Sequence, residues 1–91
     1  MNSKRFEKIG KALADPHRLK ILQEFKTTGD FLPCSRIHEI LDMTQPSISH
    51  HVKQLVDANI LESIKEGRNI KYALNTAVLD EFADYIKSLK P

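Results

Sequence analysis

Hydrophobic residues recur at helical spacing through most of this chain. In four stretches they fall at intervals of three or four residues, and each stretch opens on a side chain that can cap a helix. The four stretches cover residues 3–14, 15–28, 35–41 and 44–58. The expected caps are Ser3, Asp15, Ser35 and Thr44. We therefore predict four helices, of which the last two have the lengths and the tight turn of a helix-turn-helix.

The spacing changes from helical to alternating after residue 60. Ile70, Tyr72 and Leu74 alternate with less apolar residues, which is the period-two pattern of a half-buried strand. A second β-prone run precedes them, and a turn containing Gly67 separates the two runs. The pattern predicts a β-hairpin over residues 61–74.

A last helix is predicted from Asn75 or Thr76 to about Leu89. Its apolar positions, Leu79, Phe82, Ile86 and Leu89, follow the 3-4-3 spacing of a coiled-coil seam. The last helix could simply close the core of one chain. Because so small a chain buries limited surface by itself, we favour an interface between two copies in a homodimer.

The order of these elements predicts one domain that spans residues 1–91. The fold class is mainly α with a small β-hairpin, in the order α-α-α-α-β-β-α of a homodimeric winged helix-turn-helix. Residues 30–33 are expected to form an irregular connection that turns Phe31 and Leu32 inward.

The helix over residues 44–58 has two faces of different chemistry. Ile48, Val52 and Leu55 form an apolar stripe, and the opposite side is polar. Glutamine and serine near a helix start can read base edges in a major groove, while lysine holds phosphate. Together with the hairpin tip, the candidate DNA-binding residues are Gln45, Ser47, Ser49, His50, Lys53, Gln54, Arg68, Asn69 and Lys71. We interpret the helix as a recognition helix and the hairpin as a wing.

The histidines are expected to have different roles. His50 and His51 cannot chelate one ion, because neighbours on a helix point about 100° apart. His50 lies opposite the apolar stripe, so a DNA contact is expected. His51 lies nearer the edge of the stripe and is expected to be partly packed and hydrogen-bonded. His17, in the first turn of its helix, is expected to be structural.

Composition narrows the function classes. The formal charge of +2 is too small to indicate nucleic acid, although Arg68 and Lys71 gather near the hairpin tip. No apolar run approaches the ~20 residues of a membrane span. The single cysteine excludes an intramolecular disulfide, so we expect a cytoplasmic protein. No phosphate loop, nucleophile–base pair or HExxH motif occurs, so we expect neither an enzyme nor a cofactor.

Two segments, residues 12–22 (ALADPHRLKIL) and 44–55 (TQPSISHHVKQL), carry a family resemblance. The runs 58–61 (ANIL) and 66–74 (EGRNIKYAL) extend it in the same order and spacing. With these motifs the chain resembles the ArsR/SmtB family of bacterial winged-helix repressors over nearly its whole length. The resemblance implies a homodimer joined by its first helix, through Phe6, Ile9 and Leu13, and by the stripe of its last helix. It also implies recognition helices in successive major grooves of a duplex operator, with wings that reach toward the backbone or minor groove.

The resemblance also locates the family's usual metal sites, and this chain lacks their ligands. One site needs a Cys-x-Cys pair at the start of the third helix, where residues 33–35 are Pro, Cys and Ser. The other needs Asp and His at the start of the last helix and His with a carboxylate near its end. Those places hold Thr76, Val78 and Leu89. We expect no metal site, and a regulator that does not respond to metal in the familiar way.

Several alternatives stay open. Cys34, near a helix start, could be a redox sensor or simply a small buried hydrophobe. The inducing signal could instead be a small molecule or a protein. A winged helix used mainly for protein contacts would tolerate changes at Ser47, His50 and Arg68. RNA binding would favour aromatic stacking residues, which the polar face lacks.

Overall fold

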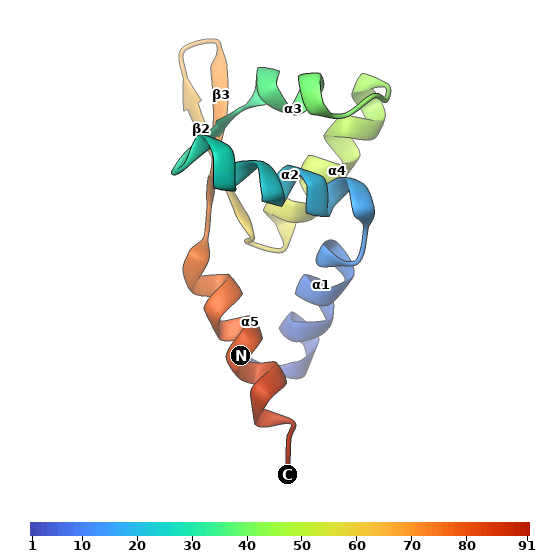
Figure 1. Ribbon diagram of the computed structural model, residues 1–91, viewed down its shortest axis with the longest axis vertical. Helices are drawn as coiled ribbons and strands as arrows, with labels where there is room; N and C mark the ends of the chain where they lie inside the picture. Colours follow the sequence, from blue (N-terminus) through green and yellow to red (C-terminus); the bar gives the residue numbers. More distant parts are fainter.

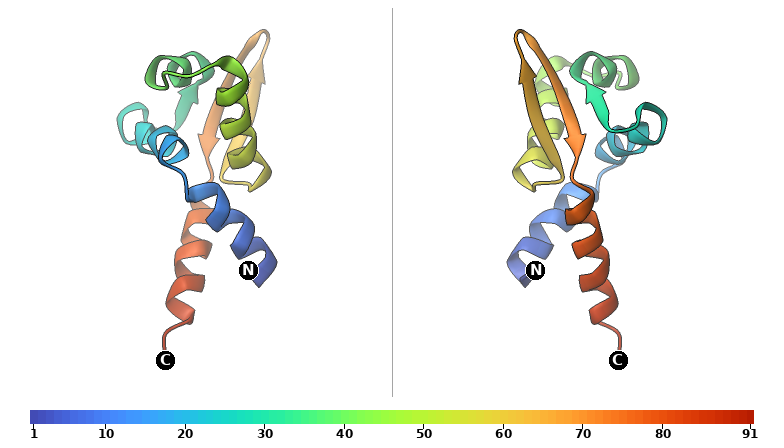
Figure 2. Two further views of the ribbon diagram at one scale, coloured as in Figure 1. Left: turned by 90° about the vertical axis from the view of Figure 1, so that its right-hand side faces the viewer. Right: turned by 90° about the vertical axis from the view of Figure 1, so that its left-hand side faces the viewer.

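The computed structural model describes residues 1–91 and has two parts, a body and an arm (Figure 1). In chain order the elements are α1 (Ser3–Leu13), α2 (Pro16–Thr28), β1 (Phe31–Pro33), α3 (Cys34–Ile40), α4 (Gln45–Asp57), β2 (Leu61–Glu66), β3 (Asn69–Leu74) and α5 (Thr76–Ser88). The body consists of α2, α3, α4 and the sheet. The arm consists of α1 and α5, which extend from one end of the body, opposite the tip of the β2–β3 hairpin (Figures 1 and 2). The molecule is therefore elongated, with extents of 47 × 23 × 21 Å.

Most helix starts lie where the caps predicted them. Asp15 caps α2 by accepting hydrogen bonds from the backbone N–H groups of His17 and Arg18, and Thr44 caps α4. The cap of α1 is Asn2 rather than Ser3. In both α2 and α4 a proline occupies the first turn, where its missing N–H costs no helical hydrogen bond.

The start of α3 corrects a prediction. The helix begins at Cys34, one residue earlier than expected, and Ser35 does not cap it. Pro33 holds the N-cap position with extended backbone and provides no side-chain hydrogen bond. The strand β1 runs directly into α3, so the chain has no separate capping residue between them.

Residues 31–33 correct a second prediction, because they form a strand instead of an irregular connection. The sheet has the order β1-β3-β2 with antiparallel pairing, and Leu32 and Ser63 both lie opposite Tyr72. Successive side chains of a strand point to opposite faces. Leu32 is therefore fully buried, whereas Phe31 is 44% exposed instead of inward-facing. The observed order is α-α-β-α-α-β-β-α.

The hairpin has the predicted position. Strands β2 and β3 pair from Leu61 with Leu74 to Glu66 with Asn69. Gly67 has φ +61°, so the two-residue turn begins with the positive φ that favours glycine in tight hairpins. Arg68 completes the turn and lies at its tip.

One apolar core fills the body and extends to the inward-facing residues of α1 and α5. The stripe of Ile48, Val52 and Leu55 on α4 is buried in it, as predicted. The side chains that are almost fully enclosed are Ile9, Ile21, Leu32, Ile37, Leu55, Ile60 and Leu61. This packing holds α4 firmly against the rest of the body and leaves its polar side outward.

Candidate nucleic-acid interface

The polar side of α4 is presented to solvent. Gln45, Ser49, His50, Lys53 and Gln54 are all exposed, as the recognition-helix prediction requires. Since the opposite stripe is locked in the core, these residues cannot turn inward. The helix therefore offers its N-terminal half to a ligand without rearrangement of the body.

The polar residues of α4 divide into two sides. Gln45, Ser49 and Lys53 line a groove shared with Ile70 of the hairpin. Ser47 and His50 line a second groove on the side of the α2 N-terminus. The fold thus places one row of polar residues beside the hairpin and another row away from it.

Two of the α4 candidates already have polar partners. The hydroxyl of Thr44 donates to Ser47 Oγ at 3.0 Å, so the Ser47 hydroxyl proton stays available for another acceptor. Lys53 Nζ lies 3.0 Å from Asp57 Oδ2 in an exposed pair. Exposed pairs of this kind contribute little, so Lys53 can exchange Asp57 for a phosphate at small cost.

The hairpin tip does not hold its basic residues equally. Lys71 Nζ lies 2.7 Å from Glu66 Oε1 and 4.1 Å from the centre of the Phe31 ring. Arg68, on the turn, makes no ion pair or side-chain hydrogen bond, and neighbouring Asn69 is exposed. Arg68 is therefore the freer of the two cations, which the sequence pattern treated alike.

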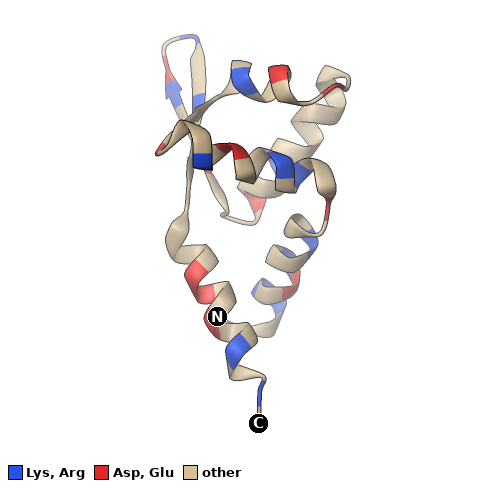
Figure 3. Ribbon diagram, viewed as in Figure 1, with Lys and Arg blue, Asp and Glu red and all other residues tan.

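Charge also separates the two helices of the arm (Figure 3). Helix α1 carries Lys4, Arg5, Lys8 and Lys11 against Glu7, whereas α5 carries Asp80, Glu81 and Asp84 against Lys87. Only one ion pair joins the helices within a chain, between Arg5 and Glu81 at 3.9 Å.

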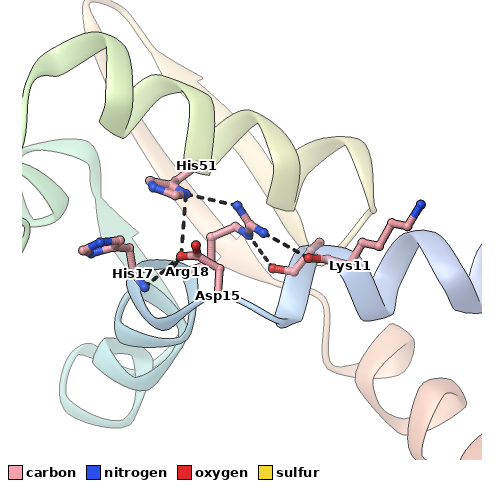
Figure 4. Close-up of polar contacts among 6 residues, drawn as sticks. Lys11, Asp15, His17, Arg18 and His51 are labelled. Carbon is pink, nitrogen blue, oxygen red and sulfur yellow. Dashed lines mark hydrogen bonds and ion pairs between the residues drawn. The ribbon is translucent and has the colours of Figure 1, made fainter.

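Behind α4, the side chain of Arg18 connects three elements (Figure 4). Its Nε donates to the carbonyl of Ala12 at 2.6 Å, and one terminal nitrogen donates to the carbonyl of Lys11 at 3.0 Å. The other terminal nitrogen lies 3.1 Å from His51 Nδ1 on α4. The prediction that His51 is partly packed and hydrogen-bonded is confirmed.

The sequence reading missed Arg18 itself. A signal was present, because Arg18 stands in the first turn of α2, where the helix dipole disfavours a cation. An arginine in that position indicates a specific acceptor elsewhere. The partners lie six, seven and 33 residues away, beyond the reach of a periodicity argument.

Ionisation at this junction is shifted in two groups. Burial lowers the pKa of His51, with Arg18, His17 and His50 acting in the same direction and Asp15 opposing them. For Asp15, burial alone would raise the pKa, but the backbone N–H groups of Arg18 and His17 and nearby positive charge bring it below its usual value. The structure therefore favours a neutral His51 beside an ionised Asp15.

Cys34 is half-buried at the start of α3 and is the only cysteine. Burial, and then the adjacent Cys34 thiol, raise the pKa of Tyr72. No group of three or more His, Cys, Asp or Glu side chains is placed to hold a metal ion. A redox role for Cys34 stays a prediction.

No helix is long and apolar enough to cross a membrane.

The predicted interface residues on the arm are distributed unevenly. Phe6 stacks on Phe82 and Tyr85 with ring centroids 4.6 and 4.5 Å apart. Leu13 and Leu79 are half-buried against the core, while Ile86 and Leu89 are 44% and 65% exposed. Ile9 is the correction in this set: it is fully buried within one chain, since α1 packs this residue inward, and leaves no surface for a partner.

Comparison with known proteins defines the class. A profile described as a helix-turn-helix domain matches residues 13–64. The arsenical resistance operon repressor of Staphylococcus xylosus is 38% identical over 86 residues, which cover 94% of this chain and 77% of that protein. The transcriptional repressor SdpR of Bacillus subtilis is 37% identical over 78 residues, which cover 86% of this chain and 84% of the relative.

Solved structures agree with this class. An ArsR-like transcriptional regulator from Rhodococcus superposes with a TM-score of 0.80 at 26% identity, over 94% of this chain and 79% of that one. The chain belongs to the ArsR family of helix-turn-helix transcriptional regulators. It is a DNA-binding transcriptional repressor of that family and not an enzyme, and the sequence-based assignment is confirmed.

Proposed function

We propose that the protein represses transcription as a homodimer bound to a palindromic duplex operator. Each chain inserts the N-terminal half of α4 into a major groove, and Arg68 on the hairpin contacts the backbone or minor groove. The observation that carries this proposal is the exposed polar face of α4 beside a hairpin with a free arginine. Two related half-sites then lie about one helical turn apart, ~10 bp or slightly more.

The arm supports the dimer in this proposal. Exposed Ile86 and Leu89 continue the apolar stripe that begins at Phe82, next to the stacked aromatic rings. Contact between two arms would cover these side chains. It would also bring the basic α1 of one chain near the acidic α5 of the other, so charge complementarity favours contact between these helices.

The residues of the interface divide between reading and positioning. Gln45, Ser47 and His50 reach base edges, with Ser49 and Gln54 beside them on the same exposed face. Lys53 on α4 contacts the DNA phosphates, and Arg68, Asn69 and Lys71 contact them from the hairpin. Because Lys71 is held by both Glu66 and the Phe31 ring, Arg68 contributes more than Lys71 to binding.

Selection of bound duplexes from a random pool, followed by competition titrations, tests the proposal. Gln45→Ala or Ser47→Ala should reduce discrimination between operator variants by about 1–3 kcal/mol for each good contact that the side chain made with a base edge. Arg68→Ala should instead weaken binding to specific and random DNA alike. It should also reduce the salt dependence of the affinity by the equivalent of about one phosphate contact. Lys20→Ala, an exposed change on α2 away from α4, is the control.

Two results would contradict the proposal. Equal losses on specific and random DNA for Gln45→Ala and Ser47→Ala would remove α4 as the reading element. Normal operator binding by variants at Ser47, His50 and Arg68 would point to a winged helix that works through protein contacts.

A further inference from the structure

The side chain of Arg18 makes the only hydrogen bonds that join the end of α1 to the middle of α4 (Figure 4). Guanidinium is planar and carries five N–H donors in a fixed fork, so several bonds made at once fix its orientation. Two of its bonds go to the carbonyls of Lys11 and Ala12, in the last turn of α1. Carbonyls there lack helical partners, so α1 needs donors of this kind. The third bond goes to His51 on the recognition helix.

This arrangement connects the arm to the recognition helix. Helix α1 belongs to the arm, and α4 carries the exposed polar face. If two arms join two chains, the angle between arm and α4 sets the distance and tilt of the two recognition helices. Small displacements at such a junction are costly for binding, because both helices must enter successive grooves together.

We propose that Arg18 is a positioning residue for operator binding, and that neutral His51 is the acceptor that closes its link to α4. The inference rests on the proposed function and adds a way in which pH can regulate operator binding. When the link is closed, both recognition helices of the dimer are held at the operator spacing. When it opens, each helix can still touch DNA, but the pair loses its fixed geometry.

The link requires one protonation state. Arginine has donors only, so His51 Nδ1 must accept and the imidazole proton must lie on Nε2. Protonation of His51 puts a proton on Nδ1, removes the acceptor and sets two cations side by side. The loss of this bond is the switch.

Charged groups face His51 from three elements. Asp15 Oδ1, on the α1–α2 junction, lies 3.8 Å from Nδ1 and favours the protonated imidazole. That carboxylate already accepts two backbone N–H bonds, from His17 and Arg18. The His17 ring on α2 and the His50 ring on α4 lie 5.4 and 5.7 Å away, and Arg18 is closest. Their charges oppose protonation, and with burial they keep the pKa of His51 below its usual value.

His51→Asn provides a sharp test, because the amide oxygen of asparagine takes the place of Nδ1 and accepts at any pH. Operator affinity of the wild type and His51→Asn is measured by anisotropy from pH 8 to 5.5. We expect equal affinities within about twofold at pH 8. We expect the wild type to fall behind by about fivefold or more, the lower end of typical coupling factors, once the pH has fallen below the pKa of His51. A ratio that stays constant with pH overturns the proposal.

His17→Asn is the matched control, since it removes a neighbouring imidazole that makes no side-chain hydrogen bond. It should keep the acid loss of the wild type. His50 is present in all three proteins, so its contacts with DNA are common to the comparison. If His17→Asn abolishes the acid loss while His51→Asn retains it, the titrating group is His17 and the inference fails.

Arg18 is tested by the coupling between two changes. Arg18→Met and His51→Phe should each weaken operator binding by about tenfold, and the double variant should lose little more than either one. Additive losses, or equal losses on operator and random DNA, would mean that Arg18 acts only through general stability. A nitrogen NMR titration of His51 provides a readout without DNA, in which Nδ1 must be the unprotonated nitrogen at pH 8. Failure of the proposed function appears differently, as a wild type that binds no duplex at any pH.

Discussion

The body and the arm use the same kind of amphipathic helix for different ends. On α4 the apolar stripe is sealed in the core, and Leu55 has no exposed surface. On α5 the corresponding stripe runs outward until Leu89 is 65% exposed. Both stripes have helical periodicity, so period alone does not distinguish a core helix from a helix that awaits a partner. The difference lies in what the fold places opposite each stripe.

The contrast also separates what the two regions contribute to binding. The body provides a reading surface that is rigid because its back is packed. The arm provides an unfinished apolar surface and opposite charges on its two helices. The Arg18–His51 link lies where the two regions meet.

The largest effect should come from cutting into the core of the body. Ile37 is fully buried, so Ile37→Ala should lower the free energy of unfolding by about 2–5 kcal/mol. Leu89→Ala removes a similar volume from the arm, where the side chain is largely exposed, and should cost less than about 0.5 kcal/mol in dilute protein. Urea unfolding at low protein concentration measures both. Equal losses would end the distinction between body and arm.

The arm should show the reverse behaviour in assembly. Ile86→Glu puts a charge on the exposed apolar stripe and should raise the dimer dissociation constant by about thirtyfold or more, as expected of an interface hot spot. Ile64→Glu, a half-buried change on the hairpin, is the control and should leave assembly unchanged. Light scattering against concentration gives the result. A wild type that stays monomeric at micromolar concentration, with or without DNA, would refute the dimer.

Acid should weaken the junction between the regions moderately. The folded-state pKa of His51 lies below 6.5. As the pH falls below 6.5, the unfolded chain therefore binds more protons than the folded chain does, which destabilises the folded state. The contribution of His51 to stability is complete above pH 6.5 and is lost as the pH falls through the folded-state pKa. Asp15 acts in the same direction at lower pH, below 3.8. Urea unfolding should show that His51→Asn loses less stability than the wild type between pH 7.5 and 5. An equal loss would place the acid sensitivity elsewhere.

The elements with long periodic patterns could be predicted from the sequence. The caps at Asp15 and Thr44 and the stripe of α4 depend on neighbours within one or two turns, and local reasoning captures such features. Strand β1 could not be predicted, because three residues offer too little alternation and its pairing partner Tyr72 lies 40 positions later.

Side-chain roles divide along the same line. The exposure of the candidates on α4 follows from helical geometry. The burial of Ile9, the pairing of Lys71 with Glu66 and the bridge made by Arg18 depend on where distant elements meet. The hydrophobic pattern placed Ile9 on the apolar face of its helix. It did not indicate whether the same chain or a partner would bury that face.

The smallest effect concerns metals, and it tests both regions together. The family's two usual sites fall one in the body, at residues 33–35, and one in the arm, at Thr76, Val78 and Leu89. Neither offers a set of deprotonated ligands, and Cys34 with His38 one turn away provides only two per chain. We therefore predict that stoichiometric zinc, cadmium or arsenite changes operator affinity by less than about threefold, below the coupling typical of an effector. Anisotropy of an operator duplex under reducing conditions measures this. A chelator-reversible loss of tenfold would reveal a site shared across the dimer, and Cys34→Ser would then show whether the thiol belongs to it.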